Sequence, residues 1–208
     1  MIRGVFFDMD GTVTRPHIDW RELRRRVGVP EGTPIMAHVE SLCGPERQRA
    51  EGMLLAAEME AAELAELNPG AAELLSGLRQ AGLKLALITN NHRQAMERVV
   101  TRFALSFDVL LSREDGPLKP APDLLLLALE RLGLQPGEAC FVGDGHYDRL
   151  ASQAAGIRYL HLAHDGQERP GEPTLLALRA AWQHLGRDPV SPPRAPAVGS
   201  ASGSPPPA

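Results

Sequence analysis

Short runs of mainly apolar residues recur along the chain, and most of them stop at a polar or acidic residue. The clearest cover residues 5–7, 83–88, 107–111 and 139–142, and a weaker one covers 157–162. Continuous apolar runs of this length are typical of parallel strands that are buried on both faces. The pattern therefore predicts five strands of a parallel sheet.

Helical patterns separate the later strands. They cover residues 71–80, 94–103, 123–132 and 149–155, and Asn68 before the first of them is expected to be its N-cap. Strands that alternate with helices predict an α/β fold with a doubly wound, Rossmann-like parallel sheet. In such folds, ligands bind at the carboxyl ends of the strands.

Two stretches fall outside this alternation. Between the first and second strands lies a segment with helical patterns over residues 20–27 and 45–67, which we interpret as a small helical cap inserted into the core. The end of the chain is dominated by Pro, Ser, Ala, Gly and Arg, and it is expected to be disordered because it can bury too little apolar surface. The expected division is a core of residues 1–14 and 68–185, a cap of residues 15–67 and a tail of residues 186–208.

Composition and charge argue against several classes of protein. The 208 residues carry a formal net charge of -4, without the basic surface of a nucleic-acid-binding protein. No run approaches the ~20 apolar residues of a membrane helix, and no signal-peptide pattern opens the chain. Cys43 and Cys140 stand apart and fit a reducing compartment. We therefore expect a cytoplasmic protein without a membrane or nucleic-acid partner.

Residues suited to catalysis or to ligand binding follow four of the predicted strands. Because the carboxyl ends of parallel strands meet at one edge of a sheet, we expect these side chains to lie close together. A single such residue would be explained as part of a turn or as a helix cap. Four groups, each of them after a predicted strand, favour a functional site. They are Asp8 and Asp10, then Thr89 and Asn90, then Lys119, and finally Asp144 and Asp148.

Several carboxylates at one edge would repel one another. Two unit charges 4 Å apart repel by about 4 kcal/mol at an effective dielectric constant near 20. A divalent cation and Lys119 would relieve this repulsion, and carboxylate oxygens suit Mg²⁺, which shares its coordination shell with phosphates. Lys119 is one of only two lysines; the other, Lys84, lies within a strand and is expected to reach solvent. The sequence thus predicts a Mg²⁺ cofactor.

Four sequence motifs resemble those of haloacid dehalogenase-like hydrolases. They are the Asp-Met-Asp-Gly-Thr run at residues 8–12, Thr89, Lys119 and the Gly-Asp-Gly-His-Tyr-Asp run at residues 143–148. Their order and their placement at strand ends match as well, over about residues 2–162. The insertion after the first motif resembles that of helical-cap members such as phosphoglycolate phosphatase-like enzymes, although it is shorter.

The resemblance implies a Mg²⁺-dependent phosphatase that acts on a small phosphorylated metabolite. Asp8 would attack phosphorus and form an aspartyl-phosphate, while Asp10 would protonate the leaving oxygen and later deprotonate water. Thr89 and the backbone N–H of Asn90 would hold phosphate oxygens, and Lys119 would neutralise charge on the phosphoryl group.

The resemblance also implies a set of metal ligands. Mg²⁺ would bind the carboxylates of Asp8 and Asp144 and the main-chain oxygen of Asp10. Asp148 would support this shell or orient Lys119 rather than coordinate directly.

Other activities of the same fold are less compatible with the residues present. A dehalogenase needs no acid at Asp10, a phosphonatase needs a cap lysine that residues 15–67 lack, and a transport ATPase needs membrane segments. A phosphomutase-like phosphotransferase and a non-catalytic binding protein remain as alternatives. The substrate and the oligomeric state are not predicted by the sequence.

Overall fold

A parallel sheet forms the centre of the protein in the computed structural model, which describes residues 1–164, 174–175 and 178–185. Its six strands lie in the order β3-β2-β1-β4-β5-β6, and all of the pairings are parallel. The chain winds outward from β1 in one direction and then returns to place β4 on the other side of β1. This reversal marks the point at which α/β folds bind their ligands. The strands are β1 (Gly4–Phe7), β2 (Lys84–Ile88), β3 (Val109–Leu111), β4 (Ala139–Gly143), β5 (Arg158–Leu162) and β6 (Thr174–Leu175).

Helices cover both faces of the sheet. Alternate residues of each strand point to opposite faces, so Val5 and Phe7 join one apolar cluster while Phe6 joins the other. All three are at most 1% exposed. The first face packs against α4 (Ala71–Gln80), α5 (Arg93–Arg102), η2 (Leu178–Ala180) and α8 (Ala181–His184), and the second against α6 (Asp123–Leu132) and α7 (His146–Ala155).

The predicted fold class is confirmed, and the differences in detail have local causes. Strand β3 begins at Val109 rather than at residue 107, since the side chain of Asp108 accepts a hydrogen bond from the backbone N–H of Leu85 at 2.8 Å. Strand β6 was not predicted because two residues are too few for a hydrophobic pattern. The predicted tail, residues 186–208, lies outside the described residues.

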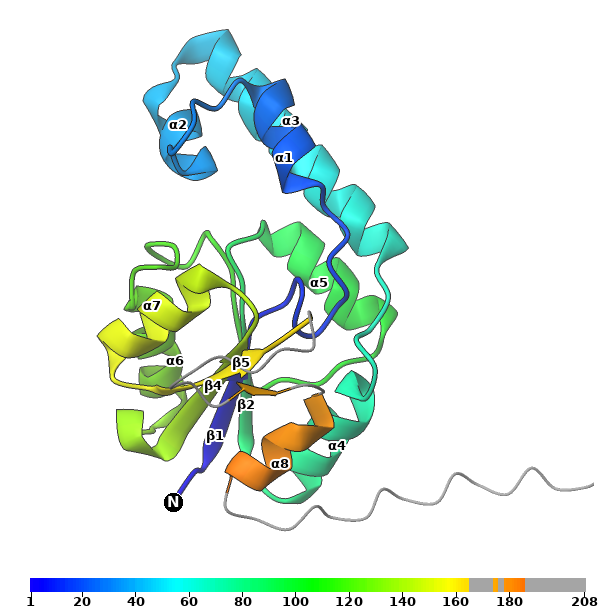
Figure 1. The fold of residues 1–208 in the computed structure, drawn as a ribbon, viewed down its shortest axis with the longest axis vertical. Coiled ribbons are helices and arrows are strands. Elements are labelled where there is room, and N and C mark those ends of the chain that lie inside the picture. The colour runs from blue at the N-terminus through cyan, green and yellow to red at the C-terminus, as the bar shows by residue number, and fades with distance from the viewer. Residues whose placement is uncertain (165–173, 176–177, 186–208) are drawn as a thin grey trace, which may run out of the picture.

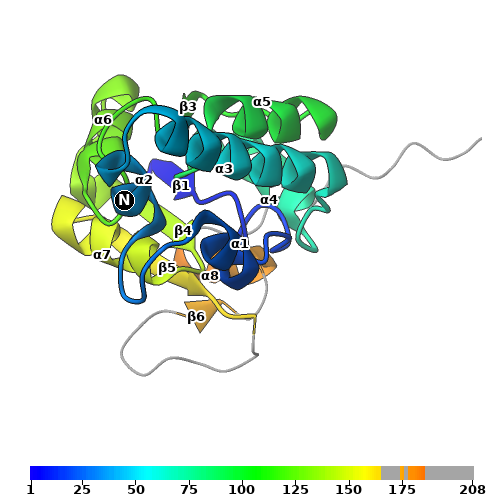
Figure 2. The ribbon, with the colours of Figure 1, turned by 90° about the horizontal axis from the view of Figure 1, so that it is seen from above.

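Three helices form a cap on the side of the sheet toward which β1 runs (Figure 1). They are α1 (Trp20–Val27), α2 (Ile35–Ser41) and α3 (Gly44–Leu64), of which α2 was not predicted. They enclose a small apolar core of their own, made by Leu23, Val39, Ala50 and Leu54. Helix α3 also packs along α5 of the core, as seen from above in Figure 2.

Two chain segments connect the cap to the core, and they run side by side. Thr14 and Leu67 form an isolated antiparallel bridge, and the N–H of Arg15 donates to the carbonyl of Glu66 at 2.8 Å. The predicted limits of the cap, residues 15 and 67, stay a prediction. No helix in the described part of the chain is long and apolar enough to cross a membrane.

The two cysteines differ sharply in exposure. Cys43 is exposed before α3, whereas Cys140 is buried within β4, where burial raises the pKa of its thiol to about 12. Because the thiolate is the reactive form, we expect iodoacetamide at mildly alkaline pH to label Cys43 in the folded protein and both residues in denaturant. Mass spectrometry of the labelled peptides would show this, and rapid labelling of native Cys140 would contradict its burial.

Candidate active site

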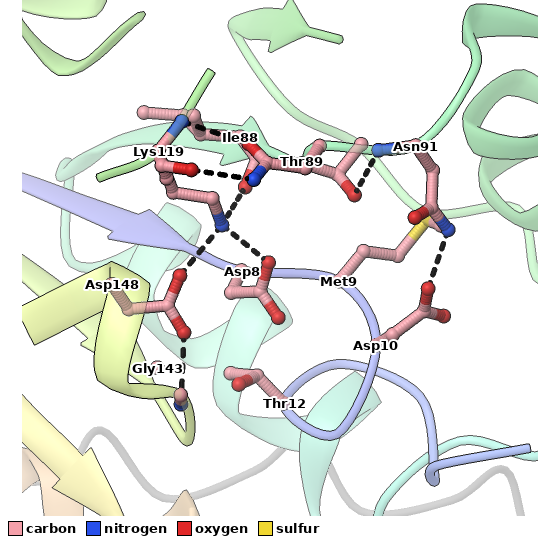
Figure 3. Close-up of polar contacts among 12 residues, drawn as sticks. Asp8, Met9, Asp10, Thr12, Ile88, Thr89, Asn91, Lys119, Gly143 and Asp148 are labelled. Atoms are coloured by element: carbon pink, nitrogen blue, oxygen red, sulfur yellow. Dashed lines mark hydrogen bonds and ion pairs between the residues drawn. The ribbon is translucent and has the colours of Figure 1, made fainter. Parts of the chain in front are cut away.

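Lys119 lies at the centre of the polar cluster at the strand ends (Figure 3). Its Nζ donates to Asp8 Oδ1 at 2.6 Å, to Asp148 Oδ1 at 2.7 Å and to the carbonyl of Ile88 at 3.0 Å. These three bonds use all the protons of an ammonium group. With 4% of its surface exposed, Lys119 is held in one position between two carboxylates.

The loop after β2 holds the backbone of Lys119. The side chain of Asn90 donates to the carbonyl of Lys119 at 2.8 Å and accepts from its N–H at 3.0 Å. In the same loop, the hydroxyl of Thr89 accepts from the N–H of Asn91 at 3.1 Å. The sequence predicted a backbone role for Asn90, and this side-chain clamp was missed because it joins positions 29 residues apart.

Three carboxylates form an acidic cluster beside Lys119. One oxygen from each of Asp8, Asp144 and Asp148 lies within 4.8 Å of the others. The hydroxyl of Thr12 donates to Asp144 Oδ1 at 3.2 Å, and the N–H of Gly145 donates to Asp148 Oδ2 at 3.0 Å. Asp148 therefore both orients Lys119 and contributes to the cluster.

Lys119 alone does not balance the charge of this cluster. Burial raises the pKa of Asp8 well above its usual value, an effect that Lys119 opposes and that Asp148 and Asp144 reinforce. Burial, followed by the charge of Asp148, raises the pKa of Asp144. Burial lowers the pKa of Lys119, but Asp148 and Asp8 outweigh it and leave the pKa above its usual value. Because Lys119 is one cation beside three carboxylates, the cluster stays negatively charged and rich in oxygen atoms. Mg²⁺ prefers sites of this kind.

Two glycines allow the carboxylates to come this close. Gly11 has a φ of 85°, and a Cβ at this position would lie 2.1 Å from Asp144 Oδ2. A Cβ on Gly143 would lie 2.7 Å from the Cβ of Asp148. Any larger residue at either position would displace a carboxylate of the cluster.

The side chain of Asp10 turns away from the acidic cluster. Its Oδ2 accepts a hydrogen bond from the amide of Asn91, and its Oδ1 accepts one from the hydroxyl of Thr14 at 3.3 Å. Burial raises the pKa of Asp10, although these hydrogen bonds lower it in part. A carboxyl group with a raised pKa is suited to hold and donate a proton.

Asn68 is part of the site rather than the predicted cap of α4. Gly70 occupies the N-cap position, with no side-chain hydrogen bond. The amide of Asn68 instead donates to the carbonyls of Gly11 at 3.0 Å, Thr12 at 2.8 Å and Thr14 at 3.1 Å. Asn68 therefore fixes the loop that carries Asp10, and no pattern in the sequence indicates this role.

The cluster opens into a cavity of about 370 Å³ between core and cap. The cap contributes Trp20 to its lining, and the start of α7 contributes Tyr147. The structure thus brings all seven predicted site residues to one cavity, as Asp8, Asp10, Thr89, Asn90, Lys119, Asp144 and Asp148.

A buried ion pair joins the cap to the core near this cavity. Glu58 of α3, 2% exposed, pairs with Arg113 at 2.7 Å and accepts from the N–H of His92 at 3.0 Å. Burial raises the pKa of Glu58, while Arg113 and the His92 N–H lower it. Neither charged residue was predicted from the sequence, because nothing in their local pattern relates positions 55 residues apart.

We expect Glu58→Ala to lower the free energy of unfolding by about 3–5 kcal/mol, because it leaves the half-buried Arg113 without its partner. Urea unfolding would measure the loss. The matched control is Glu63→Ala on the same helix, since Glu63 pairs with Arg98 at 2.7 Å with both side chains about half exposed. This control should cost much less because solvent screens an exposed pair, and equal losses for the two variants would contradict the prediction.

Comparison with known proteins identifies the family. A family model described as haloacid dehalogenase-like hydrolase matches residues 2–156. The chain belongs to this family. The prediction from the four motifs, a haloacid dehalogenase-like hydrolase, is thereby confirmed.

Individual relatives of this haloacid dehalogenase-like hydrolase support the assignment. A haloacid dehalogenase-like hydrolase domain-containing protein of Arabidopsis thaliana is 33% identical over 190 residues, which cover 86% of this chain and 78% of the relative. Phosphoglycolate phosphatase 1 of Pseudomonas aeruginosa is 27% identical over 186 residues, covering 75% of this chain and 67% of that protein.

A solved structure shares the fold. The crystal structure of a subfamily IA, variant 1 hydrolase from Geobacter sulfurreducens matches with a TM-score of 0.63 at 24% identity, covering 89% of this chain and 97% of that one. At this identity the likeness shows the fold alone, a Rossmann-like core with a helical cap region.

Proposed function

We propose that this hydrolase is a Mg²⁺-dependent phosphatase, which cleaves a small phosphate monoester through an aspartyl-phosphate on Asp8. The observation that carries the proposal is the contact of Lys119 Nζ with Asp8 and Asp148 at the base of a cavity, beside Asp144. A carboxylate held by a cation next to further acidic ligands is suited to accept a phosphoryl group. The relative named as a phosphoglycolate phosphatase supports the same class of reaction.

In the first step, a carboxylate oxygen of Asp8 forms a bond to phosphorus, and the ester P–O bond breaks. The electron pair of that bond goes to the leaving oxygen, which takes the proton of Asp10 and departs as an alcohol. The raised pKa of Asp10 favours the protonated form that this step needs.

In the second step, water attacks the phosphorus of the aspartyl-phosphate. Asp10, now ionised, accepts a proton from this water, and the P–O bond to Asp8 breaks. The products are inorganic phosphate and free Asp8, with Asp10 protonated again. A covalent intermediate divides one difficult displacement into two easier ones.

The remaining residues bind and neutralise the phosphoryl group. The hydroxyl of Thr89 and the backbone N–H of Asn90 hold its oxygens, and the ammonium of Lys119 balances their charge. Mg²⁺, bound by Asp8, Asp144 and the main-chain oxygen of Asp10 with Asp148 in support, would supply further neutralisation of the phosphate and fix its orientation.

Release of inorganic phosphate from a panel of phosphate monoesters, with phosphoglycolate among them, tests the proposal. We expect turnover with Mg²⁺ and a fall of at least about 100-fold with a chelator, restored when Mg²⁺ is added back. Products should contain free phosphate rather than a phosphorylated second substrate, which distinguishes hydrolysis from transfer. Failure of every ester, together with the absence of an aspartyl-phosphate after exposure to acetyl phosphate, would favour the binding-protein alternative.

A further inference from the structure

A second cavity continues from the phosphate cavity into the space between cap and core. Its volume is about 670 Å³. Both cavities are lined by Trp20, Asn90, Asn91, Lys119 and Tyr147, so they share a wall and meet at these residues. If a phosphate monoester is bound over Asp8, the organic group attached to it extends into the second cavity.

Apolar side chains make up most of the wall of this second cavity. The cap provides Ile35 and Met36 of α2, which are half-buried, and Leu54 of α3. The core provides the segment before Lys119, with Pro117 and Leu118. Contact with such a wall favours a ligand that removes apolar surface from water.

The charged residues of the wall offer little to a second anionic group. Arg113 is already paired with Glu58 at 2.7 Å. Arg24 donates to the carbonyl of Pro30 at 3.0 Å, and Glu40 in the same lining carries the opposite charge. The two arginines of the lining are matched by two glutamates, and its third cation, Lys119, already contacts Asp8 and Asp148.

Two aromatic side chains stand where the cavities meet. Trp20 begins α1 in the cap and is 41% exposed, and Tyr147 lies in the first turn of α7 and is 44% exposed. Most large apolar side chains in the described residues are buried. The exposed aromatic surface at this place can therefore contribute binding energy when a ligand covers it. Flat groups gain both burial and favourable ring contacts beside such residues.

We infer that the leaving group of the substrate is a sizeable, uncharged and largely apolar alcohol, with a flat part that contacts Trp20 and Tyr147. This inference rests on the proposed phosphatase activity and adds the chemical class of the substrate. It differs from a small anionic ester such as phosphoglycolate, whose carboxylate would lie against a mainly apolar wall in which Arg113 is already paired with Glu58.

Three esters of primary alcohols test the inference. They are ethyl phosphate, 2-phenylethyl phosphate and phosphoglycolate, and kcat/KM is measured for each with Mg²⁺. We expect kcat/KM for 2-phenylethyl phosphate to exceed that for ethyl phosphate by at least about tenfold, because its ring buries apolar area in the second cavity. Phosphoglycolate should not exceed ethyl phosphate.

A charge placed in the cavity wall should reduce this preference. Ile35 is the first residue of α2, where an acidic side chain is compatible with a helix start, so Ile35→Asp is expected to fold. The ratio of kcat/KM between the phenylethyl and ethyl esters should fall at least about fivefold in this variant. The matched control is Leu126→Asp, at an exposed leucine of α6 that lines neither cavity, and it should leave the ratio unchanged.

The outcomes separate the inference from the proposed function. Preference for phosphoglycolate, equal use of the three esters, or an unchanged ratio in Ile35→Asp would overturn the inference. In each of these three cases, the proposed function stands if acetyl phosphate still phosphorylates Asp8. If no ester is hydrolysed and Asp8 is not phosphorylated, the proposed function fails and the inference fails with it.

Discussion

Replacing Asp8 with asparagine should abolish phosphate release, with kcat falling at least about 10⁴-fold. The amide keeps the size of the carboxylate but cannot attack phosphorus, so no aspartyl-phosphate should form. The rate of phosphate release measures the loss of turnover. Acid-stable labelling of the protein by a phosphoryl donor measures whether the aspartyl-phosphate forms. A variant that retains a tenth of the activity would exclude Asp8 as the nucleophile.

The same substitution should leave the fold intact, which separates a chemical loss from a structural one. The raised pKa of Asp8 means that the folded, metal-free protein disfavours its ionised form. For a carboxyl group with a raised pKa, stability falls as pH rises above the unfolded value, here 3.8. Asparagine lacks this penalty, and Lys119 keeps its ion pair with Asp148, so at neutral pH with chelator Asp8→Asn should unfold at the same or a higher urea concentration. The control is Asp123→Asn, at an exposed site on α6, which should keep full activity.

Replacing Lys119 with methionine should lower both activity and stability. Methionine fills similar space but leaves Asp8 and Asp148 without the cation that contacts each of them. Breaking a buried ion pair in this way costs about 3–5 kcal/mol, a large part of the ~5–15 kcal/mol that stabilises a typical domain. Turnover should fall about 10³-fold because charge on the phosphoryl group is no longer balanced.

The chain contains its own control for this experiment. Lys84, the other lysine, is exposed at the start of β2, as the sequence predicted, and Lys84→Met should change neither turnover nor stability appreciably. Mg²⁺ should recover part of the lost stability in Lys119→Met, since a cation bound to the folded state shifts the equilibrium by mass action. Urea unfolding with and without Mg²⁺ measures this, and a variant as stable as the parent would contradict the central position of Lys119.

The sequence by itself predicted five of the six described strands and the residues that meet at one edge of the sheet. Continuous apolar runs are required by strands buried on both faces, and they locate β1, β2 and β4 within a residue or two. Because parallel strands place their carboxyl ends at one edge, the residues that follow these strands had to meet. This is why Asp8, Thr89 and Asp144, which directly follow β1, β2 and β4, could be predicted to meet without coordinates.

Only the tertiary structure decided how these side chains face one another. The turn of Asp10 toward Asn91, the bonds from Asn68 to the loop after β1, and the pair of Glu58 with Arg113 all join residues far apart in sequence. Local patterns of hydrophobic and polar positions report the burial of each element but not which polar groups it meets. The size and apolar wall of the second cavity were decided in the same way, because they depend on how the cap helices lie over the core.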